Sequence, residues 1–98
     1  MPLASPLYPF REAVVRGAPN DSGVYALYAH GRLLCVGAAT GRSPADTIRA
    51  KLLARLHQQA DRAERPTHYK WEICSDPASR VAQYRRGLGA AVRDCDGD

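Results

Sequence analysis

The 98-residue sequence contains no apolar run near the roughly 18–20 residues that a membrane-spanning helix needs. Its first residues, MPLASPLYPFREA, lack a cationic start and are interrupted by three prolines, so we expect no signal peptide. Internal repeats, low-complexity segments and a glycine-rich phosphate loop are also missing. These absences predict a protein with no membrane partner and a cytoplasmic location.

Cysteine is scarce, and its three positions, 35, 74 and 95, are far apart. They form no C-x-x-C pair and show no metal-ligand spacing with the three histidines. We therefore expect free, mostly buried thiols in a reducing compartment.

The composition is that of one small globular domain, with 45% hydrophobic and 24% charged residues. Fourteen Lys and Arg against ten Asp and Glu give a formal net charge of +4, which favours an anionic partner such as nucleic acid. We expect residues 1–22 to form an N-terminal arm and loop, residues 23–93 a single domain, and residues 94–98 a frayed tail.

The stretch from Ser22 to Thr40, SGVYALYAHGRLLCVGAAT, contains two short apolar runs. The runs are rich in strand-favouring residues and are joined by the pair His30-Gly31. This pattern predicts a β-hairpin with strands over 24–29 and 33–36.

Two helices and a further strand follow the hairpin. Ser43 as N-cap and Pro44 in the first turn predict a helix over about 44–59. Alternating residues in HYKWEIC predict a strand over 68–74, with Tyr69, Trp71 and Ile73 on its buried face. Asp76 and Pro77 predict the start of the second helix. The fold class expected is α/β (α+β), with a small three-stranded, mostly antiparallel sheet flanked by helices in the order β-β-α-β-α.

This order resembles the GIY-YIG endonuclease superfamily, with GVY (residues 23–25) opening the first strand and CVG (residues 35–37) closing the second. The segments APNDSGVYALY, TIRAKLLARL and RPTHYKWEICSDP are similar to further parts of the family. The resemblance covers roughly residues 10–86. It implies a metal-dependent endonuclease acting on nucleic acid, with DNA favoured.

In that family a motif tyrosine is thought to take a proton from the attacking water, and a helix arginine stabilises charge on the phosphate. Tyr25 matches the first motif tyrosine, and the alternative for it is an aromatic residue packed in the core. Cys35 stands where the second tripeptide has tyrosine. A thiol cannot replace a phenol across the same distance, so one candidate proton carrier is lost.

The family's Arg-x-x-x-His pair falls on Lys51 and Arg55 of this sequence. Arg49 lies two residues before Lys51, and His57 lies two residues after Arg55. Lysine supplies charge without a planar fork, and arginine cannot act as a base at neutral pH. The candidate catalytic residues are therefore Tyr25, Cys35, Arg49, Lys51 and Arg55. The candidate nucleic-acid-binding residues are Arg42, Arg49, Lys51, Arg55 and His57, and the alternative for the helix residues is a solvated face.

The glutamate that holds Mg²⁺ or Mn²⁺ in the family has no counterpart, because PASRVAQYRRGL contains no acidic residue. Gln83 is the closest match, and a neutral amide is a poor anchor for Mg²⁺. Glu72 is the nearest acidic alternative, although a surface charge on the strand is its simpler role.

Four hypotheses remain open. A GIY-YIG-like domain that binds nucleic acid with weak or lost cleavage is favoured, and an active metal-dependent endonuclease is the first alternative. The same fold serving as a protein-interaction module is a further alternative. Outside the family, the chain is a small basic α/β protein whose hairpin only looks like the motif.

Overall fold

The computed structural model describes residues 6–58, 66–88 and 93–94. Five strands form one sheet: β1 (Tyr8–Pro9), β2 (Gly23–Ala29), β3 (Arg32–Ala39), β4 (His68–Ile73) and β5 (Arg93–Asp94). The helices are α1 (Glu12–Val15), α2 (Ile48–Gln58) and α3 (Pro77–Leu88). No helix within these ranges is long and apolar enough to cross a membrane.

The strand order is β1-β4-β2-β3-β5, and all pairs are antiparallel except β3 with β5. The three central strands, β2, β3 and β4, agree with the strands that the sequence predicts. The expected three-stranded sheet is wrong in extent, because β1 and β5 add a strand at each edge. Each of these strands is two residues long, too short to produce a periodic pattern in the sequence.

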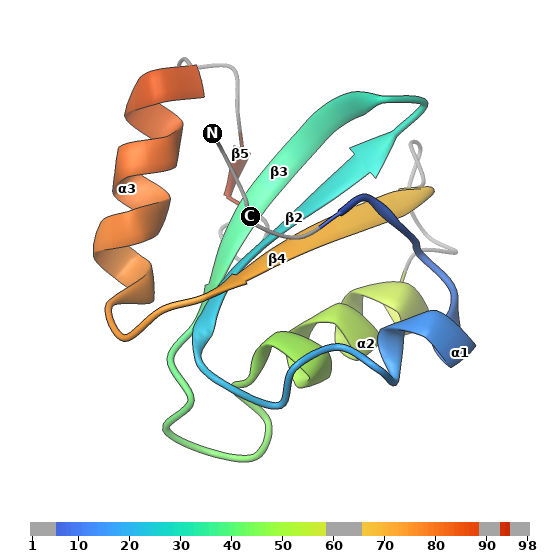
Figure 1. Cartoon of the computed structure of the whole chain (residues 1–98), viewed down its shortest axis with the longest axis horizontal. Coiled ribbons are helices and arrows are strands. Elements are labelled where there is room, and N and C mark those ends of the chain that lie inside the picture. Colours follow the sequence, from blue (N-terminus) through green and yellow to red (C-terminus); the bar gives the residue numbers. More distant parts are fainter. Residues whose placement is uncertain (1–5, 59–65, 89–92, 95–98) are drawn as a thin grey trace.

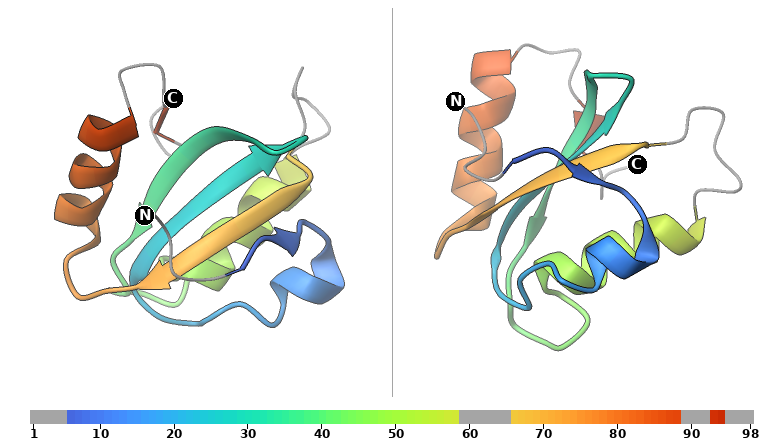
Figure 2. Two further views of the ribbon diagram at one scale, coloured as in Figure 1. Left: turned by 45° about the horizontal axis from the view of Figure 1, so that its top comes forward. Right: turned by 45° about the vertical axis from the view of Figure 1, so that its right-hand side comes forward.

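The sheet lies between two helical layers, with α1 and α2 on one face and α3 on the other (Figures 1 and 2). As a result β2 is covered on both faces. Tyr25 and Leu27 pack with Ile48 and Leu52 of α2, while alternate β2 residues pack against Val81 of α3.

The predicted hairpin is confirmed. His30 and Gly31 both have positive φ, 54° and 80°, which is the signature of a two-residue turn that follows the twist of its strands. The register shifts by one residue between Leu27 and Tyr28, which face Cys35 and Leu33 respectively.

The segment before Gly23, expected to be an arm and loop, contributes Phe10, Val15 and Ala18 to the core. Phe10 also packs its ring edge against Tyr69 at a centroid distance of 6.0 Å. At the other end, Asp94 pairs with Val36 in the strand β5, and the rest of the expected tail lies outside the described residues. The folded unit therefore includes described residues on both sides of the predicted domain core.

The first long helix begins later than predicted. Thr47, rather than Ser43, is its N-cap, since the Thr47 Oγ1 accepts a hydrogen bond from the Ala50 N–H at 3.2 Å. The preceding residues form a turn in which the Asp46 N–H donates to the Ser43 carbonyl at 3.0 Å. Residue 59, the predicted last residue of this helix, lies outside the described residues.

The third central strand carries its predicted alternation over most of its length. Tyr69 is buried and Trp71 partly buried, but Ile73 is 53% exposed, which corrects the prediction of a buried side chain. Ile73 lies opposite Gly23, which has no side chain to cover it. The next helix starts as predicted, with Asp76 Oδ1 accepting from the Ser79 N–H at 3.4 Å.

Candidate functional site

The two motif tripeptides lie on adjacent strands and meet at one residue pair, Tyr25 opposite Gly37. Tyr25 has an exposed fraction of 0% and belongs to the core cluster beneath α2. A catalytic base must come within hydrogen-bond reach of the water that it deprotonates. In this structure Tyr25 is a packed core residue, which is the alternative role that the sequence left open for it.

Both motif glycines are required by packing. A Cβ on Gly37 would lie 2.5 Å from Cζ of Tyr25, and one on Gly23 would lie 2.1 Å from the carbonyl oxygen of Glu72. Any side chain at either position would collide with the tyrosine ring or with the neighbouring strand. The glycines therefore account for the close approach of β2 to its neighbours without any reference to chemistry.

Cys35 lies on the same face of the sheet as Tyr25 and is 5% exposed. The expectation of three free thiols is wrong for this residue, because Cys35 is disulfide-bonded. Cys74 is free, and burial raises the pKa of its thiol. Cys95 lies outside the described residues. A disulfide sulfur has no proton, so Cys35 cannot carry one in a reaction.

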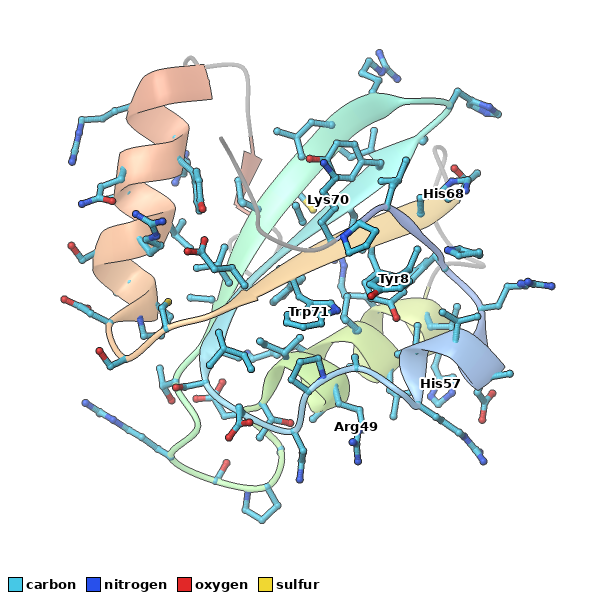
Figure 3. The ribbon with its side chains drawn as sticks, in the orientation of Figure 1. Tyr8, Arg49, His57, His68, Lys70 and Trp71 are labelled. Atoms are coloured by element: carbon cyan, nitrogen blue, oxygen red, sulfur yellow. The ribbon has the colours of Figure 1, made fainter. Side chains whose placement is uncertain are left out.

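Arg49 anchors a loop. Its Nε donates to the carbonyl oxygen of Ala18 at 2.9 Å, and its backbone N–H donates to the carbonyl oxygen of Pro19 at 3.0 Å. In Figure 3 its side chain extends from α2 away from the sheet. These contacts join α2 to the chain that leads into β2 and engage one guanidinium nitrogen in holding that loop.

The other helix candidates lie on α2 with acidic neighbours. Lys51 Nζ is 3.7 Å from Asp46 Oδ1, and the exposed His57 Nε2 is 3.8 Å from Glu12 Oε1. Arg55 is partly exposed on the same helix. The hydrogen bond from the Thr40 hydroxyl holds the pKa of Asp46 below its usual value, and the nearby Lys51 ammonium lowers it further.

Arg42 is exposed on the loop between β3 and α2. Its backbone N–H donates to Thr40 Oγ1 at 3.4 Å. The same hydroxyl donates to Asp46, so this loop is organised by side-chain hydrogen bonds close to the start of α2. The basic candidates thus come from one layer, the α2 side of the sheet.

Gln83, the candidate metal ligand, lies on α3, in the opposite layer from α2. Its Oε1 accepts a hydrogen bond from Nη1 of Arg80 at 3.0 Å. The fold therefore does not bring Gln83 together with Tyr25, and its amide oxygen is engaged in a contact within α3.

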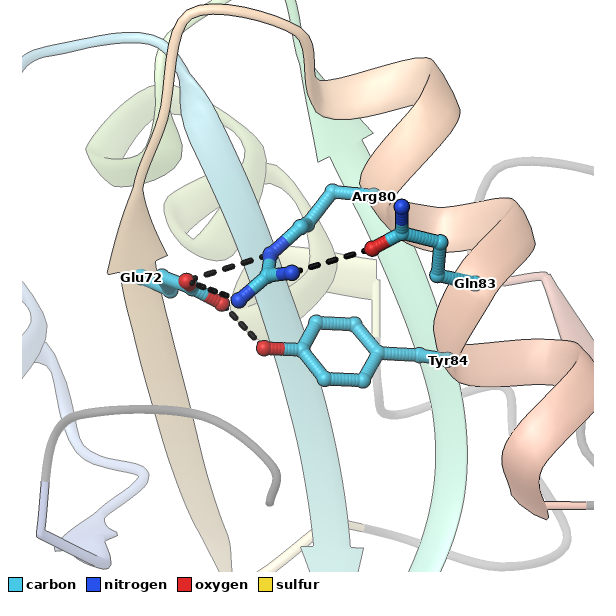
Figure 4. A network of polar contacts seen from close by, with 4 residues as sticks. All are labelled: Glu72, Arg80, Gln83 and Tyr84. Carbon is cyan, nitrogen blue, oxygen red and sulfur yellow. Dashed lines mark hydrogen bonds and ion pairs between the residues drawn. The ribbon is translucent and has the colours of Figure 1, made fainter.

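Glu72 joins β4 to α3 in a polar network (Figure 4). Arg80 donates to Glu72 Oε2 from Nε at 3.2 Å and from Nη2 at 2.8 Å, and the Tyr84 hydroxyl donates to Oε1. The Arg80 guanidinium also lies 5.2 Å from the centre of the Tyr84 ring. Both carboxylate oxygens of Glu72 therefore accept hydrogen bonds from α3.

The network shifts the pKa values of its members. Burial acts to raise the pKa of Glu72, but the hydrogen bonds from Arg80 and Tyr84 outweigh it and hold the pKa below its usual value. Burial, followed by the hydrogen bond to Glu72, raises the pKa of Tyr84 to about 12. Glu72 is therefore an ionised partner of α3 at neutral pH.

The donor set does not fit a Mg²⁺ or Mn²⁺ site. Among the described residues, no three His, Cys, Asp or Glu side chains are grouped so that they could hold a metal ion. Mg²⁺ is bound through carboxylates, and Glu72, the acidic candidate, is already neutralised by Arg80. We therefore assign no metal ligand to Gln83 or Glu72.

Sequence reasoning missed two contacts on the α3 side of the sheet. Lys70 Nζ lies 5.6 Å from the centre of the Tyr28 ring, and Glu72 pairs with Arg80. The strand alternation that placed Lys70 and Glu72 on one face was visible in the sequence. The pairing of Tyr28 with His68, which sets Lys70 beside the ring, depends on the sheet register.

Known proteins offer no direct guide to the role of these residues. Comparison with protein families, with curated proteins and with solved structures found no match to this chain.

Proposed function

We propose that this chain is a GIY-YIG-like domain that binds nucleic acid, and that its capacity for phosphodiester cleavage is weak or lost. The observation that carries the proposal is the meeting of the two tripeptides on adjacent strands beneath a basic helix, with Tyr25 opposite Gly37. The strand-strand-helix-strand-helix order of the central elements supports it as well.

The basic candidates support nucleic-acid binding. Arg42, Arg49, Lys51, Arg55 and His57 come from α2 and the loop before it, and the chain has a formal net charge of +4. Cations gathered in one layer attract phosphates and release counterions when they bind them. Arg42 is exposed and Arg55 is partly exposed, so we expect both side chains to contribute to this affinity.

Weak or lost cleavage follows from the positions of the other candidates. Tyr25 is enclosed in the core, Cys35 has no proton to transfer, and Gln83 belongs to the opposite layer. Losing a group that stabilises charge lowers the rate of cleavage by about 10²-fold or more, and losing a proton carrier has an effect of similar size.

Binding and cleavage are measured separately. A fluorescein-labelled 20-bp duplex and a supercoiled plasmid serve as probes, the plasmid with 5 mM Mg²⁺ or Mn²⁺. We expect binding that weakens as salt rises, and no nicking above a protein-free control. Arg55→Gln should weaken duplex binding severalfold, while Arg11→Gln, an equal change of charge on an exposed residue before α1, should have little effect.

Each other outcome selects a different function. Metal-dependent nicking that Tyr25→Phe abolishes would establish an active endonuclease. Absence of binding to any nucleic acid at low salt would leave the protein-interaction module.

Gln83→Glu restores the residue type of the family, and we expect it to produce no nicking because residue 83 is separated from Tyr25 by the sheet.

The cytoplasmic location expected from the sequence stays a prediction. The disulfide at Cys35 argues against it, because disulfides persist mainly in oxidising compartments.

A further inference from the structure

The sheet face on the α3 side carries a group of aromatic and basic side chains that the proposed function does not use. Tyr28 on β2 lies opposite His68 on β4 and Leu33 on β3, and Lys70 follows His68 on the same face. All four side chains are partly exposed. We call Tyr28, His68 and Lys70 the aromatic-basic platform.

The platform lies away from the helix that covers this face. The buried cluster under α3 is made of Val24, Ala26, Val36 and Val81, and Tyr28 packs at its border. Figure 3 shows His68 near one end of β4 and Lys70 in its middle, while α3 stands beyond the other end of the strand. The platform is therefore a flat part of the sheet that α3 leaves partly open.

Contacts within the platform hold its members in place. Lys70 Nζ lies over the Tyr28 ring at 5.6 Å from its centre, and His68 Nδ1 is 2.9 Å from the Thr67 hydroxyl. The Lys70 ammonium therefore occupies a π-face of Tyr28, and its flexible stem allows it to leave the ring for an anionic partner. Burial raises the pKa of Tyr28, so its hydroxyl stays neutral at physiological pH.

The three strands β2, β3 and β4 carry little acidic charge. β2 and β3, both described in full, contain no Asp or Glu, and Arg32 at the start of β3 is exposed. The single acidic residue of β4, Glu72, is neutralised by Arg80 at 2.8 Å. An anionic ligand meets no opposing charge along these strands.

We propose that Tyr28, His68 and Lys70 form a binding surface for single-stranded nucleic acid, in which the Lys70 ammonium moves from the Tyr28 ring to a phosphate and the adjacent base takes its place on the ring. The proposal rests on the nucleic-acid-binding function above and places part of that function on the face opposite α2. Unpaired bases expose the π-faces that stack on aromatic side chains, whereas bases in a duplex are covered by their neighbours. A single strand is therefore the ligand that uses both the ring and the charge.

The test measures fluorescence anisotropy of fluorescein-labelled dT15 and of a 15-bp duplex with the full chain. Tyr28→Leu removes the ring and keeps apolar volume, and we expect it to weaken dT15 binding by about 10-fold or more. Tyr28→Phe keeps the ring and should bind as the unchanged protein does. Urea unfolding followed by emission of Trp71, the single tryptophan, verifies that each variant is folded.

The charge is tested by salt dependence. Lys70→Gln should reduce the slope of log K against log salt for dT15 by about 0.7, the value for one phosphate contact on a single strand. Arg86→Gln makes the same change of charge on the exposed surface of α3 and should leave the slope unchanged. Equal effects of the two substitutions would show that dT15 is attracted by the overall positive charge of the chain, and would overturn the proposed role of the platform.

The outcomes separate this inference from the proposed function. Binding that Arg55→Gln weakens and Tyr28→Leu leaves unchanged would overturn the platform and keep the function. Equal weakening of dT15 and duplex binding by Tyr28→Leu would refute the preference of the platform for single strands. Displacement of dT15 by an equal concentration of a polyglutamate peptide would overturn the proposed ligand and indicate that the platform binds an acidic protein segment. Absence of all nucleic-acid binding would overturn both proposals.

Discussion

The ring of Tyr25 occupies the space that a side chain on Gly37 would need, since a Cβ at residue 37 would lie 2.5 Å from Cζ and 2.6 Å from the hydroxyl oxygen of Tyr25. The two residues face each other across β2 and β3. The glycine of one tripeptide therefore makes room for the tyrosine of the other. This packing relation links the two tripeptides without reference to any function.

Gly37→Ala tests this relation directly. We expect it to lower the free energy of unfolding by about 1–3 kcal/mol, because the added methyl group forces the ring or a strand to move. Urea unfolding followed by Trp71 emission measures the loss. Gly87→Ala is the matched control, because a Cβ there meets nothing within 4 Å in α3, and it should stabilise the chain by up to about 1 kcal/mol. A Gly37→Ala protein as stable as the unchanged chain would contradict the packing described.

Thr47→Ala tests the start of α2. The Thr47 hydroxyl accepts from the Ala50 N–H and donates to Asn20 Oδ1 at 2.9 Å, so its loss should cost about 1–2 kcal/mol of stability. Ser43→Ala should cost less than about 0.5 kcal/mol, because surface substitutions away from a cap rarely exceed that value. Thermal or urea unfolding of both variants distinguishes the observed cap from the one expected in the sequence.

Glu72→Gln tests the network that joins β4 to α3. With side chains 17% and 41% exposed, Glu72 and Arg80 form a better-shielded ion pair than Glu12 and Arg16, at 48% and 69%. We expect Glu72→Gln to cost about 1 kcal/mol, and Glu12→Gln to cost less than about 0.5 kcal/mol.

The dependence of the free energy of unfolding on pH, below neutral pH, tests the same network a second time. The pKa of Glu72 is lowered in the folded protein, so its contribution is complete above the ordinary carboxyl pKa and is lost as pH falls through the folded value. Urea unfolding between pH 3 and pH 7 should therefore show a smaller decline at low pH for Glu72→Gln than for the unchanged chain. Parallel curves would contradict the assignment.

The raised pKa of Tyr84 predicts how the stability of the fold changes at high pH. Its pKa is raised from the ordinary value near 10 to about 12, so the folded chain favours the protonated phenol. The resulting stabilisation is complete below about pH 10 and is lost as pH rises toward 12. Absorbance titration at 295 nm should show one tyrosine fewer titrating near pH 12 in Tyr84→Phe, and its stability should fall less between pH 10 and pH 11.

Local signals explain what the sequence predicted correctly. His30-Gly31 fixes the hairpin because both residues accept positive φ, and Asp76-Pro77 marks the start of α3. The N-cap of α2 was predicted four residues early, since Ser43 and Thr47 are both acceptable caps and the choice depends on the contact of Thr47 with Asn20, far away in sequence.

The candidate site depends on contacts between segments that are distant in the sequence, and residue patterns along the chain do not predict such contacts. The enclosure of Tyr25 requires α2, Gly37 and the segment around Phe10 and Val15, whose packing leaves no periodic pattern. The separation of Gln83 from Tyr25 follows from the face on which α3 packs, and a β-β-α-β-α order leaves that choice open. Neither arrangement could be obtained from residue spacing alone.

The placement of β1 and β5 at opposite edges of the sheet has a consequence for synthesis on the ribosome. β4 emerges more than 25 residues after β3, and β5 emerges about 20 residues later still, so the outer edge of β3 at Cys35 and Val36 stays unpaired until the last described residues leave the exit tunnel. During that interval an apolar strand edge is open to pairing with another nascent chain. Completion of the sheet is thus a late step in the folding of this domain, because it requires residues 93–94.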